Sequence, residues 1–199
     1  MPRFCANLSF LFTEVPFLDR FEAAAKAGFK GVEYMNPFEA PKAEIAARLK
    51  AHGLTQALFN VAHGDLAKGE RGISAIPGRE AEFVKGIAAG LDYAETLGCQ
   101  RMFAMAGLRH HGAERKTYVA KLEIAARLAA KASADIIIEP INSRDIPGYF
   151  LNTTGDARSI IHEVGEPNLG LQFDLYHRQV MEGDVAKAID EFGPLARHY

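Results

Sequence analysis

The sequence has few cysteines and no long apolar run. Two cysteines among 199 residues, Cys5 and Cys99, are too few for a disulfide framework or for a zinc site closed by four thiolates. No segment reaches the ~18 uninterrupted apolar residues that a membrane-spanning helix needs, so we expect no membrane insertion. The N-terminus lacks the features of a signal peptide. Together these absences predict a cytoplasmic protein with reduced thiols.

The sequence also lacks an excess of charge of one sign. Its 23 lysines and arginines are balanced by 25 aspartates and glutamates, which gives a net charge of -2. A nucleic-acid-binding surface usually needs a basic excess, so we expect no nucleic-acid partner. The 48% of hydrophobic residues can form a sizeable core, and this excludes general disorder. No internal repeat or flexible linker divides the chain, which predicts a single domain over residues 1–199.

Strand-like and helix-like segments alternate along the chain. Apolar residues at three- and four-residue spacing predict helices over residues 17–27, 42–51, 80–97, 117–133, 156–164 and 184–192, the last with Asp184 as N-cap. Short apolar runs predict six strands that begin near residues 4, 31, 54, 101, 135 and 169. The β-branched run Ile136-Ile137-Ile138 indicates a strand buried on both faces, as in a parallel sheet covered by helices.

Two architectures accept this order of elements. Every step from one strand to the next is long enough for a right-handed parallel crossover. A doubly wound open sheet would be complete with six strands, whereas a (β/α)₈ barrel of ~250 residues would need two more units after Tyr199. The first strand is not followed by a Gly-x-Gly-x-x-Gly turn, and this disfavours only the nucleotide-binding form of the open sheet. Periodicity alone leaves both architectures open.

Two carboxylates at the ends of strands are the main candidates for chemistry. Glu139 follows the isoleucine run, and Asp174 ends the sixth predicted strand. A carboxylate at the end of a buried strand loses its hydration unless a cation, a hydrogen-bond donor or water lies beside it. A metal-binding or catalytic role is therefore expected. Two oxygen ligands beside the imidazole of His177 suit Mg²⁺ or Mn²⁺ better than structural zinc, and His177 is expected to contact the substrate. Glu33 is a weaker candidate.

A long glycine-rich and charged connection covers residues 61–79. Such a loop often carries function, and it could fold over the active-site mouth as a lid, with Arg71 binding a substrate carboxylate. The alternative is an ordinary solvated loop, which is common for this composition. We expect the other candidates to be structural, with surface histidines at His63, His110 and His111 and core thiols at Cys5 and Cys99.

Five motifs in order along nearly the whole chain resemble the hydroxypyruvate isomerase family, which includes the 2-oxo-tetronate isomerases. The motifs are Ala6-Asn7-Leu8-Ser9, Gly28-Phe29-Lys30-Gly31-Val32-Glu33, Gly69-Glu70-Arg71-Gly72 with Pro77-Gly78-Arg79-Glu80, Glu139-Pro140-Ile141-Asn142 with Asp145-Ile146-Pro147-Gly148, and Asp174-Leu175-Tyr176-His177 with Glu182-Gly183. A series of five is far more specific than any one of them.

The resemblance implies a xylose isomerase-like TIM (β/α)₈ barrel, of which this chain would hold about six β/α units. It implies a divalent metal, Mg²⁺ or Mn²⁺, bound by Glu139 and Asp174, with Glu139 also as one of two proton-transferring glutamates and His177 as a substrate-binding residue. The family's remaining ligand and second glutamate are expected on strands seven and eight. The chain is therefore expected to be truncated, with strongly reduced or no turnover, and its open edges favour association as a homo-oligomer.

The resemblance implies an aldose-ketose isomerase that acts on a small oxo-acid or sugar. It would interconvert hydroxypyruvate and 2-hydroxy-3-oxopropanoate (tartronate semialdehyde), or a related 2-oxo-tetronate, by metal-assisted proton transfer through an enediolate. A sugar epimerase on the same fold is the main alternative. A DNA-repair endonuclease on this barrel is disfavoured by the net charge of -2. A truncated, inactive barrel fragment is the remaining possibility.

Overall fold

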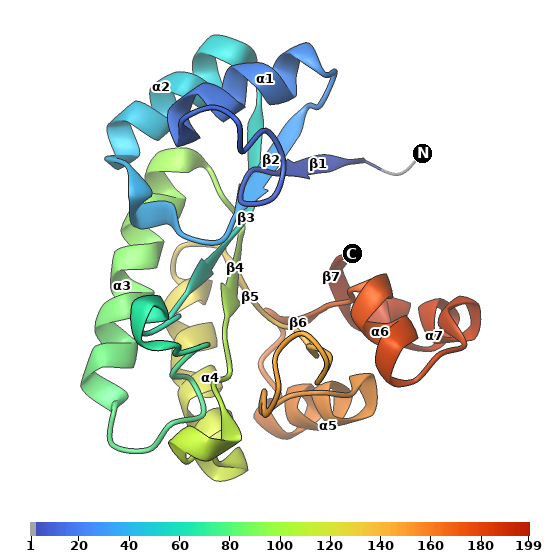
Figure 1. Cartoon of the computed structure of the whole chain (residues 1–199). Helices are drawn as coiled ribbons and strands as arrows, with labels where there is room; N and C mark the ends of the chain where they lie inside the picture. The colour runs from blue at the N-terminus through green and yellow to red at the C-terminus, as the bar shows by residue number, and fades with distance from the viewer. Residues whose placement is uncertain (1–2) are drawn as a thin grey trace.

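The computed structural model describes residues 3–199 as a curved sheet of seven parallel strands with helices on its outer face (Figure 1). The strands lie side by side in the order in which they occur in the chain. They are β1 (Cys5–Asn7), β2 (Gly31–Tyr34), β3 (Thr55–Val61), β4 (Arg101–Ala104), β5 (Asp135–Ile138), β6 (Leu169–Gln172) and β7 (Ala196–His198).

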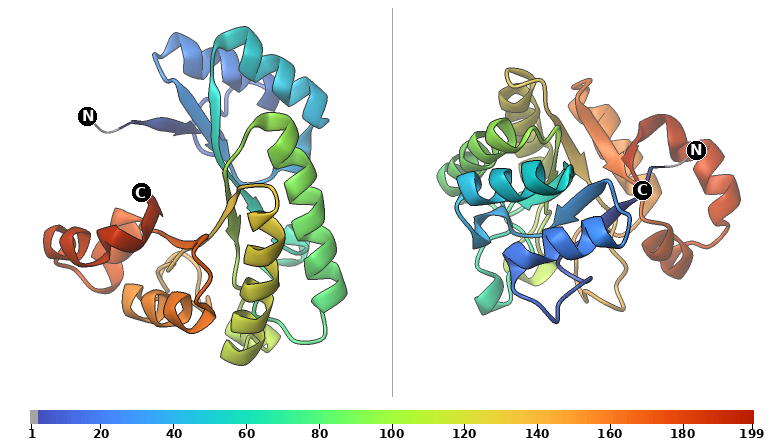
Figure 2. Two further views of the ribbon diagram at one scale, coloured as in Figure 1. Left: turned by 180° about the vertical axis from the view of Figure 1, so that it is seen from behind. Right: turned by 90° about the horizontal axis from the view of Figure 1, so that it is seen from above.

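This strand order decides between the two architectures that the sequence left open. A doubly wound sheet reverses its strand order part-way, because helices cover both of its faces. Here each strand joins the same growing edge and each pair is parallel, from β1 to β7. Figure 2 shows the resulting arc, with the helices outside it and the first and last strands, β1 and β7, at its opening. The fold is therefore part of a TIM-type barrel.

The helices agree with the sequence periodicity to within a few residues. They are α1 (Arg20–Lys26), α2 (Lys42–His52), α3 (Glu80–Leu97), α4 (Arg115–Ala130), α5 (Thr154–Val164), α6 (Leu175–Met181) and α7 (Val185–Phe192). The helix expected over residues 17–27 begins as a short 3₁₀ turn, η1 (Phe17–Asp19), before α1. Within residues 3–199 we find no helix that has both the length and the apolar character to cross a membrane.

The C-terminal part differs from the expectation in three respects. The apolar runs predict six strands, and β7 pairs with β6 as a further strand at the place where the family resemblance expects the seventh to begin; it is a three-residue segment with two basic side chains that gives no apolar signal. Helix α6 was also missed, since it is short and begins where Asp174 accepts a hydrogen bond from the backbone N–H of His177. Asp184 precedes α7 as expected, but it has positive φ and its side chain makes no capping hydrogen bond.

The sheet separates a packed outer layer from a cavity on its inner face. Ile136, Ile137 and Ile138 are all fully buried, which confirms that β5 is covered on both faces. Alternate strand residues point to opposite faces of a sheet. In β4, Met102 lies against α3 near Gly90, whereas the next residue, Phe103, lines the inner cavity. This alternation brings the polar residues at the strand ends to the inner side.

Candidate functional site

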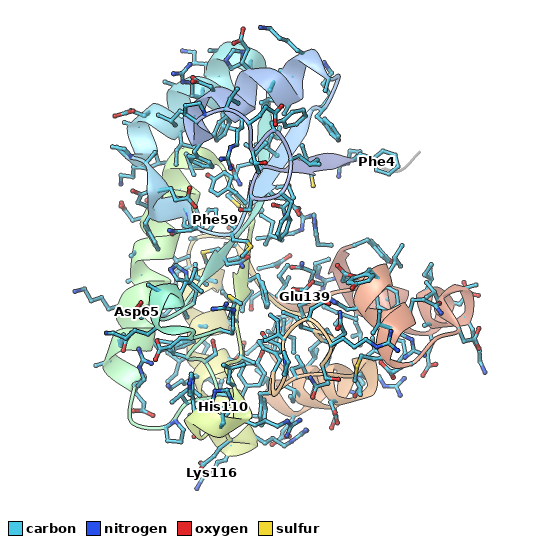
Figure 3. The ribbon with its side chains drawn as sticks, in the orientation of Figure 1. Phe4, Phe59, Asp65, His110, Lys116 and Glu139 are labelled. Carbon is cyan, nitrogen blue, oxygen red and sulfur yellow. The ribbon has the colours of Figure 1, made fainter. Side chains whose placement is uncertain are left out.

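A cavity of about 390 Å³ lies on the inner face of the sheet, at the carboxyl ends of the strands. TIM barrels place their active sites at this end. Figure 3 shows Glu139 on this inner side, between the sheet and the α6–α7 region. The lining consists of apolar side chains together with Asn7, Glu33, Asn60, Glu139, Asp145, Gln172, Asp174, His177 and His198. Among the described residues that line the cavity there is no lysine or arginine.

Three of the residues singled out in the sequence meet in this cavity. Glu139 follows β5 and is 6% exposed, Asp174 follows β6, and His177 lies in the first turn of α6. One ligand atom from each of the three lies within 4.8 Å of the others. Parallel strands bring their carboxyl ends to one edge, and this explains how residues 35 positions apart in the chain become neighbours. Their roles in catalysis and binding stay predictions.

Gln172 is a fourth member that sequence reasoning missed. Its Nε2 donates a hydrogen bond of 2.8 Å to Oε1 of Glu139, and its own Oε1 is buried without a hydrogen-bond partner in the described chain. The register between β6 and β7 shifts at Leu171/Gln172, and such irregularities often re-aim side chains beside active sites. The available signal was spacing, because Gln172 lies two residues before Asp174 in one strand run and so points to the same side.

The surroundings of Glu139 alter its acidity. Burial raises the pKa of the Glu139 carboxyl well above its usual range, and the nearby negative charges of Asp174 and Glu33 raise it further. The hydrogen bond from Gln172 opposes this shift only in part. A raised pKa strengthens the carboxylate as a proton acceptor and makes the group responsive to an added positive charge. Glu139 therefore has the environment of a general base or of a cation ligand.

His177 is held on two sides. Its backbone N–H donates to Oδ1 of Asp174 at 2.7 Å, and its ring Nδ1 lies 2.7 Å from Nδ2 of Asn142. Asn142 is fully buried behind the histidine, three residues after Glu139. The β5–α5 connection thus supplies both a carboxylate of the site and the group that orients the imidazole. The sequence motif contained Asn142, but no pattern in it indicated this contact.

A second cluster of ligand-type residues lies across the cavity. Glu33 of β2 accepts hydrogen bonds from the Cys5 thiol at 3.1 Å and from Nδ2 of Asn7 at 3.0 Å, and its Oε2 lies 2.7 Å from Nε2 of His198. Burial raises the pKa of Glu33, but the hydrogen bonds from His198, Cys5 and Asn7 outweigh it and leave the pKa below the ordinary value. The expectation that Cys5 is a core thiol was wrong, because Cys5 is only partly buried and donates to Glu33.

The two clusters differ in their need for a cation. Both carboxylate oxygens of Glu33 already have partners. In the cluster of Glu139, Asp174 and His177, two carboxylates approach each other with no lysine or arginine in the lining, and the buried Oε1 of Gln172 lacks a partner among residues 3–199. Oxygen-rich donor sets of this kind suit Mg²⁺ or Mn²⁺. The residues of the Glu139 cluster therefore fit a divalent cation.

The glycine-rich loop takes a different position from the one expected of a lid. It packs on the segment after β4, through backbone hydrogen bonds from Ser74 and Ala75 to Met105 and Ala106. The Arg71 guanidinium donates to the backbone carbonyl of Glu70, and Arg71 is not among the residues that line the cavity. In Figure 3 Asp65, near the start of this loop, lies well apart from Glu139. Substrate binding by Arg71 stays a prediction that this geometry does not support.

The remaining histidines lie outside the cavity. His110 and His111 are exposed on a short 3₁₀ turn after β4, which confirms that they are surface residues. The same expectation for His63 was wrong, because His63 is half-buried and this burial lowers its pKa. Cys99 is buried, as expected. None of these residues belongs to the groups that could hold a metal among residues 3–199.

Comparison with known proteins gives a consistent result. The sequence model of the family described as "Xylose isomerase-like TIM barrel" matches residues 21–199. The chain is 54% identical to a 2-oxo-tetronate isomerase of Cupriavidus necator, over 94% of this chain and 73% of that protein. It is 42% identical to a hydroxypyruvate isomerase of Escherichia coli, over 100% of this chain and 78% of that protein. The chain belongs to the xylose isomerase-like TIM barrel family. Its relatives place it among the isomerase-type enzymes of that family.

Solved structures agree on the fold. A Brucella melitensis protein described as an AP endonuclease of family 2 superposes with a TM-score of 0.95 at 44% identity, over 98% of this chain and 77% of that one. A D-allulose 3-epimerase from Methylomonas superposes with a TM-score of 0.72 at 22% identity, over 91% of this chain and 64% of that one, and this shows the fold alone. Proteins that share this fold thus bear the names of different activities.

Proposed function

We propose that this xylose isomerase-like chain interconverts hydroxypyruvate and 2-hydroxy-3-oxopropanoate, or a related 2-oxo-tetronate, with the help of Mg²⁺ or Mn²⁺. The observation that carries the proposal is the meeting of Glu139, Asp174 and His177 within 4.8 Å in a cavity of about 390 Å³. The names of the similar proteins from C. necator and E. coli support the substrate class. The cavity is of a size that suits a small molecule.

The reaction moves one proton between neighbouring carbons and needs no oxidant. The C3 carbon of hydroxypyruvate loses a proton, the C3 hydroxyl proton passes to the C2 oxygen, and C2 receives a proton. A divalent cation held by Glu139 and Asp174 would supply positive charge where the two adjacent substrate oxygens become negative. Glu139 accepts the carbon-bound proton, because its carboxylate is buried and lines the substrate space.

The other residues of the cavity orient the substrate and exclude water. Gln172 holds the Glu139 carboxylate in place through its hydrogen bond. Phe103, Met105 and Ile141 supply an apolar wall that limits the access of water to the reacting carbons. His177 faces the same cavity and binds a substrate oxygen. The carboxylate of Glu139 thus acts as the base, while its neighbours orient the substrate and shield the reacting carbons from water.

Two alternatives make different demands on the site. A sugar epimerase would use the same base with other substrate contacts, and a panel of ketoses separates it from the isomerase. An endonuclease, as the name of the B. melitensis protein suggests for that protein, would need a basic surface for the phosphate backbone. The described lining of the cavity offers no lysine or arginine, and the net charge of -2 gives no basic excess. We therefore propose a small-molecule substrate and no nucleic-acid partner.

The test is an assay of hydroxypyruvate conversion with EDTA, Mg²⁺ or Mn²⁺, beside 2-oxo-tetronates and ketoses. We expect slow cation-dependent conversion of an oxo-acid, strongly reduced because the resemblance places the second proton-transferring glutamate on a later strand, and no detectable conversion by Glu139→Gln because the base is lost. Glu95→Gln is the matched control, since Glu95 is exposed on α3 away from the cavity. Equal rates with EDTA and with Mg²⁺, or an active Glu139→Gln variant, would contradict the proposal.

A further inference from the structure

The side-chain amide of Asn142 has one defined orientation. Its Oδ1 accepts hydrogen bonds from the backbone N–H groups of Arg144 and Asp145, both at 2.9 Å. Because a backbone N–H can only donate, the atom that faces these two groups must be the oxygen. The Nδ2 atom therefore points the other way, toward Asp145 Oδ2 at 2.9 Å and His177 Nδ1 at 2.7 Å. If this fully buried amide were flipped, its NH₂ group would face the two backbone N–H groups and both hydrogen bonds would be lost.

The two hydrogens of Nδ2 have one acceptor each. Asp145 accepts one, and its other oxygen accepts the hydroxyl of Tyr176 at 3.2 Å. These two hydrogen bonds lower the pKa of the Asp145 carboxyl, so the group is ionised near neutrality and can only accept. The second hydrogen of Asn142 then points at Nδ1 of His177. A proton on Nδ1 would set two N–H groups against each other at 2.7 Å.

The lone pair of Nδ1 is therefore occupied, and a neutral His177 ring carries its proton on Nε2. In that tautomer neither ring nitrogen has a lone pair free for a cation. What the ring offers to the cavity that it lines is a hydrogen-bond donor, Nε2–H. A donor is what a ketone or alcohol oxygen needs as negative charge develops on it.

We propose that Asn142 is a positioning residue that fixes His177 as the Nε2–H tautomer, so that the ring presents a hydrogen-bond donor to the cavity. The meeting of this donor with a substrate oxygen rests on the proposed function, but the tautomer does not. Of the three residues whose ligand atoms converge, the inference leaves Glu139 and Asp174 as the cation-binding pair. Asn142 acts only through His177, from behind the ring.

The test reads the tautomer directly by ¹⁵N NMR of the histidine side chains at mildly alkaline pH, where a histidine ring is neutral. His177→Gln assigns the signals by deleting them from among the seven histidines. In the wild-type chain we expect Nε2 to be protonated and Nδ1 to be unprotonated, with and without Mg²⁺. A protonated Nδ1 in the wild type, or loss of the Nε2 proton when Mg²⁺ is added, would overturn the proposal.

Asn142→Asp changes the tautomer signal while it keeps the local turn. One carboxylate oxygen of the new aspartate can still accept from the N–H groups of residues 144 and 145, but the other oxygen faces Nδ1 and accepts instead of donating. We expect Nδ1 to become protonated and kcat to fall by about 10- to 100-fold. The double variant Asn142→Asp with Asp145→Asn restores the net charge and is expected to keep the protonated Nδ1.

The matched control is Asn36→Asp. Asn36 accepts a hydrogen bond from the backbone N–H of Phe38 outside the cavity, and aspartate can do the same, so the His177 signals should stay as in the wild type. An unchanged tautomer in Asn142→Asp would overturn the proposal. The spectra need no turnover. If no oxo-acid is converted but the spectra are as expected, the proposed function fails and the positioning role of Asn142 stands.

Discussion

Glu139 and Asp174 are neighbours, but their surroundings differ. Glu139 is 6% exposed and, among residues 3–199, accepts a side-chain hydrogen bond from Gln172 alone, whereas Asp174 is half-buried and caps helix α6 through His177. A buried carboxylate with an acidic neighbour is unfavourable for the folded state unless positive charge arrives. The two acidic side chains therefore lower the free energy of unfolding of the cation-free protein, and unfolding experiments can measure this effect.

Glu139→Gln is expected to stabilise the cation-free protein. Because the folded pKa of Glu139 lies above its unfolded value, the wild type loses stability as the pH rises from the ordinary value of 4.5 toward the folded pKa, and glutamine does not. We expect the variant to be more stable than the wild type at neutral pH in EDTA, and the difference to shrink as the pH falls toward 4.5. Thermal and urea unfolding between pH 4 and 8 measures this. Glu95→Gln is the control, and a variant less stable than the wild type at neutral pH would contradict this account.

Two substitutions at Asp174 separate its charge from its capping role. Asparagine still accepts the hydrogen bond from the backbone N–H of His177, so Asp174→Asn should be no less stable than the wild type while losing cation affinity. Asp174→Ala also loses the cap and should be about 1 kcal/mol less stable than Asp174→Asn. Urea unfolding and calorimetric titration with Mg²⁺ measure the two effects. Equal stability of the two variants would show that the cap contributes nothing.

At the scale of elements, a buried lysine binds the glycine-rich loop of residues 61–79 to helix α4. Lys121 of α4 is 2% exposed and donates to the backbone carbonyls of Ile73 at 3.2 Å and Ile76 at 2.6 Å, with its Nζ 5.5 Å from the ring centre of Phe83. The close approach of the loop to Met105 also requires Gly72, whose φ is +106° and which has no space for a Cβ atom. These contacts hold the loop away from the cavity.

Lys121→Met is expected to loosen this loop. The substitution leaves the two carbonyls without a donor in a buried place, which costs about 1–3 kcal/mol of unfolding free energy. Hydrogen exchange over residues 61–79 should quicken more than exchange in α5. Lys116→Met is the matched control, because Lys116 is exposed on the same helix (Figure 3). Unchanged exchange in the loop would show that the lysine does not anchor it.

Elements with a long apolar stripe were predictable and short polar ones were not. The periodicity of residues 80–97 gave both ends of α3, and the isoleucine run gave β5 with its burial. By contrast α6 depends on one capping carboxylate, and β7 depends on its pairing with β6. Likewise Glu139, Asp174 and His177 could be found from their places after strands. The contacts of Gln172 and Asn142 arise only from packing, which no local pattern encodes.

At the scale of the whole molecule, the arc has two free strand edges among the described residues. β1 and β7 each pair with a single neighbour, and the contact of Glu33 with His198 joins the two ends on the inner side. Close to the opening, the rings of Phe4 and Tyr199 are 74% and 58% exposed (Figure 3 labels Phe4). Free edges and exposed rings favour pairing with another chain.

This arrangement predicts that the 199-residue chain self-associates. Light scattering should show an average mass that rises with protein concentration across the micromolar range, and Phe4→Ser should weaken the effect because it removes an exposed ring beside β1. Val84→Ser, on the outer face of α3, is the control for loss of an exposed apolar group. A mass equal to that of the monomer, 21.7 kDa, at every concentration would contradict the prediction.

The most direct test of the central claim follows the first proton. The chain is incubated with hydroxypyruvate in D₂O with Mg²⁺, and ¹H NMR records the loss of the C3 proton signal against a sample without protein. If Glu139 takes the carbon-bound proton, the wild type and Glu95→Gln accelerate this exchange, while Glu139→Gln and samples with EDTA do not. Exchange at the protein-free rate in the wild type, or equal acceleration by Glu139→Gln, would contradict the account.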